Sequence, residues 1–363
     1  MSEAAAPPVL VSTQGHLGVL TLNRPEALHA LDGEMVRIMT EALLAWASDP
    51  AIAGVMVDHA GPRGFCAGGD IRMLAESGAK DGQDARDFFY HEYRLNHLIA
   101  HYPKPYVAIL DGVTMGGGVG ISVHGPFRIG TERTLFAMPE TGVGLFPDVG
   151  GGWFLPRLAG EIGMWLALTG TRLKAADCVA AGILTHFVPS ELLDAAKAQV
   201  AGAMSTHTPL SALKSGLAAL EEEAGRLQHL TPDTIARINH CFNGDSVEAI
   251  MDALSADESD WAKEQARVLN QKSPQTLKVA FRQLRQGRAA TDFATHMAME
   301  YRIGARVVRR HDFLEGVRAV IIDKDQAPKW QPATLAEVDD ALLDTIFAPL
   351  AAGEGPEWEP ITW

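Results

Sequence analysis

Cysteines and long apolar runs are scarce in this chain. Three cysteines stand far apart among 363 residues, and no two of them form a Cys-x-x-Cys pair. Such a set provides neither a disulfide framework nor a zinc site, and it is typical of a protein in a reducing compartment. No stretch reaches the roughly 18 apolar residues that a membrane-spanning helix needs, so we expect no membrane partner.

Positive charge is also in short supply. The chain has 31 Lys and Arg against 45 Asp and Glu, which gives a formal net charge of −14. Nucleic-acid binding needs basic patches that contact the phosphate backbone, so we expect no nucleic-acid partner. A local basic pocket for a small anionic ligand is still compatible with this balance.

The N-terminal segment has no targeting signal that we can identify. Residues 1–8, Met-Ser-Glu-Ala-Ala-Ala-Pro-Pro, have neither the basic region nor the apolar run of a signal peptide. They also lack the arginine-rich character of a mitochondrial presequence. We therefore expect no cleaved leader and predict a cytoplasmic protein.

Strands and helices alternate in the first half of the chain. Residues 9–22 read as a strand, a turn at Gly15 and a second strand. Asp32 is placed to cap a helix over residues 34–46, and residues 53–59 form a short apolar strand. A strand, a helix of about a dozen residues and another strand make the βαβ unit of a parallel sheet, so the predicted class is α/β.

The remaining pattern is increasingly helical. Residues 78–86 are polar and predict a loop before a helix over residues 87–100. Residues 171–182 predict another helix, and from residue 191 onward the pattern is mostly helical, without an internal repeat.

Two glycine-rich loops each join a strand to a helix. They are residues 66–72 and residues 114–121, and Asp70 is placed to cap the helix that follows the first. Glycine lets a ligand approach the backbone, and a helix N-terminus points N–H groups at it. Each loop alone has the composition of an ordinary turn, and neither is a Walker loop. Together they can aim two N–H groups at one carbonyl oxygen, as an oxyanion hole does.

A third loop carries two acids. Glu140 and Asp148 lie eight residues apart in a segment that Pro139 and Pro147 keep from being a regular helix. Apolar neighbours and a second carboxylate both raise the pKa of a carboxyl group, so one acid can stay protonated while another is ionised. The alternative is two solvated loop acids. Combined with an oxyanion hole, the pair favours chemistry on an acyl group or an enolate.

The sequence resembles the crotonase superfamily, which has the enoyl-CoA hydratase/isomerase fold. The motifs that carry the resemblance are Asn-Arg-Pro at 23–25, Phe-Cys-Ala-Gly-Gly-Asp-Ile at 65–71 and Met-Gly-Gly-Gly at 115–118. Residues 138–152 and 312–330 are similar to the 3-hydroxyisobutyryl-CoA hydrolase branch. The resemblance implies a crotonase-like ββα superhelical core over residues 9–200 and a helical C-terminal region over residues 201–347.

The resemblance also implies a role for particular residues. The N–H groups of Gly69 and Gly117 match the oxyanion-hole donors of the family. Glu140 matches its catalytic glutamate, and Asp148 matches the partner aspartate. Glu92 matches an acid that contacts substrate, with a solvated helix glutamate as the alternative. The other expected substrate-binding residues belong to the first glycine-rich loop: Gly68, Asp70 and Ile71.

One departure from the family pattern bears on the reaction. Enoyl-CoA hydratases use a second glutamate three residues beyond the second oxyanion glycine, and that position here is Gly120. This departure argues against hydration, and the resemblance to the hydrolase branch implies hydrolysis of a 3-hydroxyacyl-CoA thioester, with 3-hydroxyisobutyryl-CoA of valine catabolism as the favoured substrate. The sequence leaves open whether Glu140 attacks the carbonyl or activates water. The alternatives are an enoyl-CoA hydratase or isomerase and a non-catalytic acyl-CoA-binding scaffold.

We expect no cofactor, because CoA is part of the substrate, and no metal. His91, His97 and His101 are spaced six and four residues apart, but no acid cluster completes a metal site. Cys66 lies beside the first glycine-rich loop and has no evident base, so we interpret it as a small buried residue.

The basic residues that meet the CoA phosphates are not evident from the sequence. Arg24, Arg63, Arg72 and Lys278 are the candidates. The resemblance also leaves a homo-oligomer open, since crotonase relatives commonly form trimers.

Overall fold

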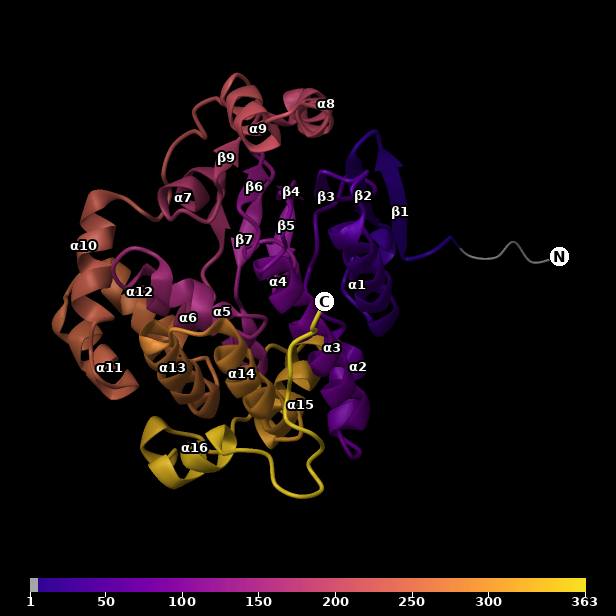
Figure 1. Ribbon diagram of the computed structural model, residues 1–363. Coiled ribbons are helices and arrows are strands. Elements are labelled where there is room, and N and C mark those ends of the chain that lie inside the picture. Colours follow the sequence, from indigo (N-terminus) through magenta and orange to yellow (C-terminus); the bar gives the residue numbers. More distant parts are fainter. Residues whose placement is uncertain (1–5) are drawn as a thin grey trace.

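A six-stranded sheet forms the frame of the N-terminal half (Figure 1). Only β1 and β2 pair antiparallel, as the expected hairpin requires, and the other neighbours are parallel. The computed structural model describes residues 6–363, so residues 1–5 of the segment used for the leader prediction lie outside it. In spatial order the strands are β1 (Val9–Gln14), β2 (Leu17–Leu22), β3 (Gly54–His59), β4 (Tyr106–Leu110), β6 (Phe127–Gly130) and β9 (His186–Phe187).

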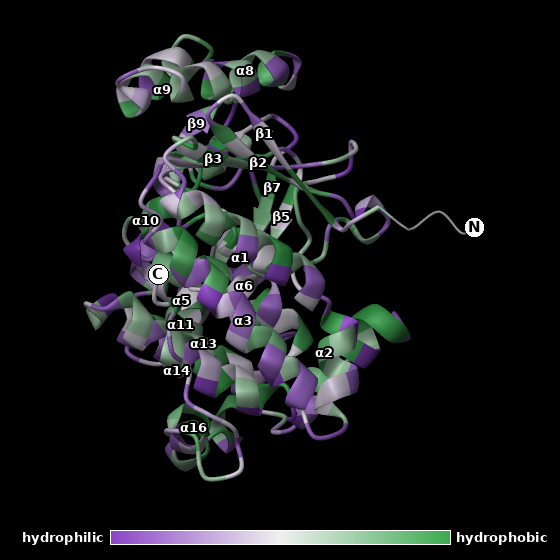
Figure 2. Cartoon of the chain, turned by 45° about the vertical axis from the view of Figure 1, so that its right-hand side comes forward, coloured by the Kyte–Doolittle hydropathy of each residue, from purple (hydrophilic) through white to green (hydrophobic). Residues whose placement is uncertain are grey.

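Both faces of the central strands β2, β3 and β4 are buried, whereas β1 is largely exposed. Leu20, Val55 and Val57 pack into the larger hydrophobic core, whereas Val19 and Met56 pack into a smaller one under α8 (Leu193–Met204) and α9 (Pro209–Ala218). Side chains alternate between the faces of a strand, so a sheet covered on both sides needs apolar residues at nearly every position. Figure 2 shows largely apolar strands inside outer helices that mix polar and apolar residues.

A small second sheet brings two of the expected loops together. Strand β5 (Val113–Met115) pairs parallel with β7 (Leu135–Ala137), which pairs antiparallel with β8 (Leu173–Lys174). Because β5 and β7 are parallel, their carboxyl ends meet at the same edge. The second glycine-rich loop follows β5 and the acid loop follows β7, so the two loops leave the sheet side by side.

Both predicted N-terminal caps are present. The Asp32 side chain accepts a hydrogen bond from Met35 N at the start of α1 (Gly33–Ser48). Asp70 accepts one from Met73 N at the start of α2 (Ile71–Gly78). These caps satisfy backbone donors that have no partner within the helix.

Two predicted boundaries are wrong. Helix α3 (Gln83–Ala100) begins four residues before the expected start, because Gly82 takes a left-handed φ of 72° and turns the chain directly into the helix. Residues 171–182 are not one helix. Residues 173–174 pair with the edge of β7, and α7 begins only afterwards (Ala175–Ala180).

The region after residue 200 is helical, as predicted, and contains no strand. Helix α14 (Phe293–Val307) lies along α3, and α13 (Pro274–Ala289) lies along α5 (Gly151–Phe154), so this region closes over the N-terminal half (Figure 1). The remaining α-helices are α4 (Gly117–Gly120), α6 (Ile162–Thr169), α10 (Pro232–Cys241), α11 (Val247–Ala256), α12 (Asp260–Leu269), α15 (His311–Val317) and α16 (Asp340–Phe347). After α15 the backbone continues as a π-helix, η5 (Arg318–Ile322). Within residues 6–363, no helix is both long and apolar enough to cross a bilayer.

Candidate active site

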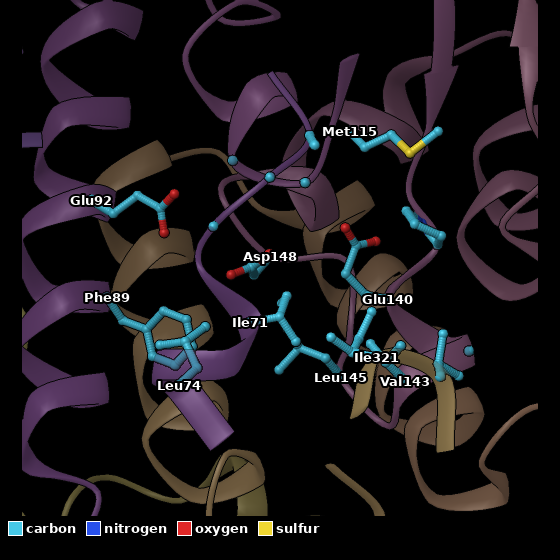
Figure 3. Close-up of a pocket in the computed structure, with 18 of the residues that line it drawn as sticks. Ile71, Leu74, Phe89, Glu92, Met115, Glu140, Val143, Leu145, Asp148 and Ile321 are labelled. Atoms are coloured by element: carbon cyan, nitrogen blue, oxygen red, sulfur yellow. The ribbon is translucent and has the colours of Figure 1, made fainter. Parts of the chain in front are cut away.

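A cavity of about 370 Å³ opens where the two glycine-rich loops, the acid loop and the C-terminal region meet (Figure 3). Its wall combines carboxyl groups with apolar side chains, and two basic residues complete it. The carboxyl groups are Glu92, Glu140 and Asp148, the apolar side chains include Ile71, Leu74, Phe89, Leu145 and Ile321, and the basic residues are Arg172 and Lys272.

Two backbone hydrogen bonds hold the glycine-rich loops against each other. Cys66 N donates to Val113 O at 2.9 Å, and Met115 N donates to Cys66 O at 3.0 Å. Gly116 has φ 46° and ψ −120°, a conformation that side chains disfavour. The two glycine-rich loops therefore run side by side at the cavity wall.

The predicted oxyanion donors face this junction. Within residues 6–363, neither Gly69 N nor Gly117 N donates to a backbone or side-chain acceptor. A methyl group placed on Gly68 would lie 3.8 Å from Gly117 N, so the two loops are in van der Waals contact. Gly69 and Gly117 both line the cavity, and two unpaired amides on one cavity wall suit a carbonyl oxygen that gains negative charge.

Glu140 begins the short 3₁₀-helix η2 (Glu140–Val143), and its side chain is buried. Burial, and then the charge of Asp148, raise its pKa well above the usual value, while Lys272 acts in the opposite direction. Its Oε1 would lie 3.2 Å from a methyl group on Gly116, and its Oε2 has no hydrogen-bond partner within residues 6–363. The carboxyl group thus rests against the second glycine-rich loop with one oxygen available to a ligand.

Asp148 lies between the two glutamates (Figure 3). Its side chain is buried, and its Oδ2 accepts a hydrogen bond of 2.9 Å from the Tyr93 hydroxyl. Burial and the charge of Glu300 raise its pKa to about 7, although the bond from Tyr93 acts to lower it. Its protonation is therefore balanced close to neutral pH.

Glu92 is buried in the cavity wall and is not a solvated helix glutamate. It lies on α3 and is only 1% exposed. Burial and then the charge of Asp148 raise its pKa well above the usual value. Its Oε1 has no partner within residues 6–363 and would lie 2.6 Å from a methyl group on Gly117, so the carboxyl group faces the oxyanion loop.

No acid can be accommodated at position 120 in this packing. A methyl group on Gly120 would lie 2.6 Å from Val149 Cβ and 2.8 Å from Asn96 Nδ2. Both distances are closer than real Cβ contacts, so a glutamate there would require the neighbouring loop to move. The three carboxyl groups of the cavity are consequently Glu92, Glu140 and Asp148.

Comparisons with known proteins agree with this geometry. The sequence model of the enoyl-CoA hydratase/isomerase family matches residues 17–347. The mitochondrial 3-hydroxyisobutyryl-CoA hydrolase of Rattus norvegicus is 48% identical over 358 residues, which cover 95% of this chain and 89% of the relative. That of Homo sapiens is 45% identical over 361 residues, with coverages of 96% and 91%. The chain belongs to the enoyl-CoA hydratase/isomerase family, in its 3-hydroxyisobutyryl-CoA hydrolase branch.

Solved structures of the family confirm the crotonase fold. A carnitinyl-CoA dehydratase from Mycobacterium thermoresistibile is 38% identical, with a TM-score of 0.89 and coverage of 98% of this chain and 99% of its own. An enoyl-CoA hydratase from Rhodobacter sphaeroides 2.4.1 is 37% identical, with a TM-score of 0.85 and coverages of 94% and 98%. The similarity includes the helical C-terminal region.

The predicted cytoplasmic location is wrong. The curated relatives of this hydrolase branch are named as mitochondrial proteins, from Gallus gallus and Xenopus laevis to Homo sapiens. The prediction relied on the composition of residues 1–8, and these names point to mitochondria instead.

Of the other predicted binding residues, some line the cavity and some do not. Gly68 and Ile71 line the cavity, but Asp70 is occupied as the cap of α2 and does not. Arg24 pairs with Asp32 at 2.9 Å.

The remaining predicted phosphate contacts lie away from the cavity wall. Lys278 pairs with Glu248, while Arg63 and Arg72 are exposed and do not line the cavity. None of these three residues lines the cavity.

Cys66 is buried in the core, and two of the candidate histidines stack on each other. Cys66 is fully buried, and burial raises its pKa to about 12. His97 and His101 stack with ring centroids 4.2 Å apart. Within residues 6–363, no three His, Cys, Asp or Glu side chains gather in a way that could hold a metal ion.

Three residues that the sequence did not mark contribute to the site. Lys272 and Arg172 supply positive charge to the cavity wall, and Tyr93 binds Asp148. Tyr93 had a weak signal, because it follows Glu92 on the same amphipathic helix. Lys272 and Arg172 had no signal in the sequence. Lys272 lies in the turn after α12 and Arg172 in the segment before β8, and only tertiary packing brings these two segments to the cavity.

Proposed function

We propose that this protein hydrolyses the thioester of 3-hydroxyisobutyryl-CoA in valine catabolism, releasing 3-hydroxyisobutyrate and free CoA. The observation that carries the proposal is the buried pair Glu140 and Asp148 facing two unpaired backbone amides, with no room for a second hydratase glutamate at position 120. The names of relatives that are 45–48% identical over most of the chain support the same substrate.

The reaction begins with the thioester oxygen on the N–H groups of Gly69 and Gly117. These donors polarise the carbonyl and stabilise the negative charge of the tetrahedral intermediate. The carbonyl carbon then lies beside Glu140, whose buried Oε2 is free of protein partners.

Two routes follow from this arrangement. In the first, Glu140 attacks the carbonyl carbon, the C–S bond breaks to leave a mixed anhydride, and water then hydrolyses the anhydride. In the second, Glu140 removes a proton from water while the water oxygen attacks. In both, protonated Asp148 gives its proton to the departing CoA thiolate.

We propose that Asp148 is the protonated acid of this cluster and Glu140 the ionised one. Buried carboxyl groups that raise one another's pKa cannot all be charged, so a protonated acid and an ionised one coexist near neutral pH. Asp148, with a pKa of about 7, can exchange a proton in either direction. Glu92 faces the same space and is proposed to accept a hydrogen bond from the 3-hydroxyl group of the substrate.

The CoA portion is proposed to leave the cavity past Lys272. A second hollow of about 420 Å³ shares Gly142, Lys272, Val320 and Gln326 with the active-site cavity. Lys272 forms no ion pair within residues 6–363, which leaves its ammonium group for the substrate. We propose that the reaction needs no cofactor, because CoA is part of the substrate. A homo-oligomer remains a prediction.

Hydration of an enoyl-CoA is the second candidate, because the structural relatives include an enoyl-CoA hydratase. The two activities are distinguished by assaying thiol release from (S)-3-hydroxyisobutyryl-CoA with a thiol-reactive dye and, in parallel, hydration of crotonyl-CoA. Thiol release without hydration supports the hydrolase. Hydration without thiol release would overturn it and would show that another acid replaces the glutamate missing at position 120, with Asp148 as the first candidate.

A further inference from the structure

The segment that follows Asp148 has a strained backbone. Val149 is buried and β-branched, yet its φ is +53°, and Gly150 has φ +81°. A β-branched residue rarely adopts the left-handed region. Such a conformation persists only where the surrounding structure imposes it, and it is often found beside functional groups.

A single carboxylate outside the cavity holds the far side of this segment. Glu300, on α14, is fully buried and accepts hydrogen bonds from Gly150 N at 2.7 Å and Gly152 N at 3.0 Å. Gln283 Nε2 donates to its Oε1 at 2.9 Å, and His296 Nε2 lies 2.9 Å from the same oxygen. Glu300 is thus the common acceptor of the network behind the loop.

The residues on either side of Asp148 are also fixed by side chains. Gln283 Nε2 donates to Pro147 O at 2.7 Å, and His124 Nε2 lies 2.8 Å from Val149 O. The backbone before and after Asp148 is therefore bound to buried side chains from the C-terminal region and from the segment after α4.

We propose that Glu300 is a positioning residue that fixes Asp148 in the cavity. Glu300 does not line the cavity and touches no reacting atom, so it acts through the loop. This role rests on the proposed function, because it matters for turnover only if Asp148 takes part in the reaction.

The charge of Glu300 matters as well as its shape. The titratable groups that face Asp148 are Tyr93 and Glu92 from α3, Glu140 from η2 and Glu300 from α14, and after burial Glu300 is the largest cause of its raised pKa. Glutamine at position 300 would keep the size but remove the charge. It would also turn an NH₂ group toward backbone or side-chain N–H donors.

The test compares Glu300→Gln with Glu161→Gln in steady-state thiol release from 3-hydroxyisobutyryl-CoA. Glu161 is a matched control, because it is also buried and accepts from Arg285 and Arg288, yet it does not line the cavity. For E300Q we expect kcat to fall by about 100-fold, as a displaced catalytic group does, with KM changed by less than roughly threefold. The alkaline limb of the kcat profile moves to lower pH, whereas E161Q keeps the wild-type profile.

The outcomes separate the two proposals. If the wild type releases thiol and folded E300Q keeps its kcat and pH profile, Glu300 has no positioning role. If the wild type releases no thiol, the proposed function falls and this role with it. Should E300Q fail to fold by circular dichroism, Gln283→Met decides, since it keeps the volume and removes the bond to Pro147 O. A lower kcat at unchanged KM in Q283M supports the network, and wild-type kinetics would overturn it.

Discussion

At the scale of single residues, the site is a group of acids whose chemistry depends on burial. Glu92, Glu140 and Asp148 stand in an apolar cavity, and each has a raised pKa because desolvation disfavours its charged form. Folding is thereby made less favourable at neutral pH in order to keep acids reactive, which is a common feature of active sites.

Replacement of Glu140 by glutamine removes the proposed nucleophile or base with almost no change of shape. We expect kcat to fall by about 10³-fold or more, in line with the usual contribution of general acid–base and covalent catalysis. Binding of the CoA ester, measured by isothermal titration, should persist, because the oxyanion amides and Lys272 are unchanged. An E140Q variant with near-normal turnover would show that the catalytic assignment is wrong.

Asp148 should make stability depend on pH. Its pKa rises from the usual 3.8 to about 7 on folding, so the folded state binds the proton more tightly. The contribution of Asp148 to the unfolding free energy is then highest below pH 4 and falls as the pH rises toward 7. Asp148→Asn should flatten this decline and raise Tm at pH 8. The free energy of unfolding at pH 8 should rise by on the order of a few kcal/mol, reduced by the weakening of the hydrogen bond from Tyr93. Thermal melts of the wild type and of D148N from pH 4 to 8 measure this pH dependence. Parallel plots of Tm against pH for the two proteins would contradict the prediction.

At the scale of elements, the loops matter because strand pairing brings them together. Strand β5 leads to the second glycine-rich loop and parallel β7 to the acid loop, while the turn after α12 adds Lys272 from the C-terminal region. An ammonium group in a half-buried wall near Glu140 is suited to an anionic or carbonyl-rich substrate.

Lys272→Met keeps the aliphatic stem and removes the charge. We expect KM for the CoA ester to rise by about tenfold, since hydrogen bonds to charged groups contribute about 1.5–3 kcal/mol. Lys278→Met is the control, because Lys278 pairs with Glu248 and Val338 O and does not line the cavity. Equal KM values for K272M and the wild type in steady-state assays would exclude this contact.

Local patterns predicted much of the elements and only part of the site. The β1–β2 hairpin, the Asp32 and Asp70 caps and the glycine-rich loops follow from turn chemistry and periodicity within a few residues. Glu300 and Lys272 reach the site from more than 100 residues away, through packing that leaves no local signal. The helix expected over 171–182 failed for the same reason, because pairing with β7 outweighed helical preference.

At the scale of the whole molecule, one hydrophobic core joins the two predicted regions. Phe89 and Leu155 of the N-terminal half share that core with Phe293, Met297 and Val307 of the C-terminal region. The predicted boundary at 200/201 also falls inside α8. The C-terminal helices thus do more than enlarge the molecule, since they close the cavity and bind the acid loop.

A fragment of residues 1–222, which ends in the loop after α9, tests whether the N-terminal region folds alone. We expect it to show no cooperative thermal transition and no thiol release, because losing α13 and α14 exposes core side chains at roughly 25 cal/mol per Å² and frees the Asp148 loop. The full-length chain is the control in the same melts and assays. A fragment that melts cooperatively but is inactive would establish residues 9–200 as an autonomous domain whose catalysis depends on Glu300 and Lys272. An active fragment would mean that neither residue is needed for turnover.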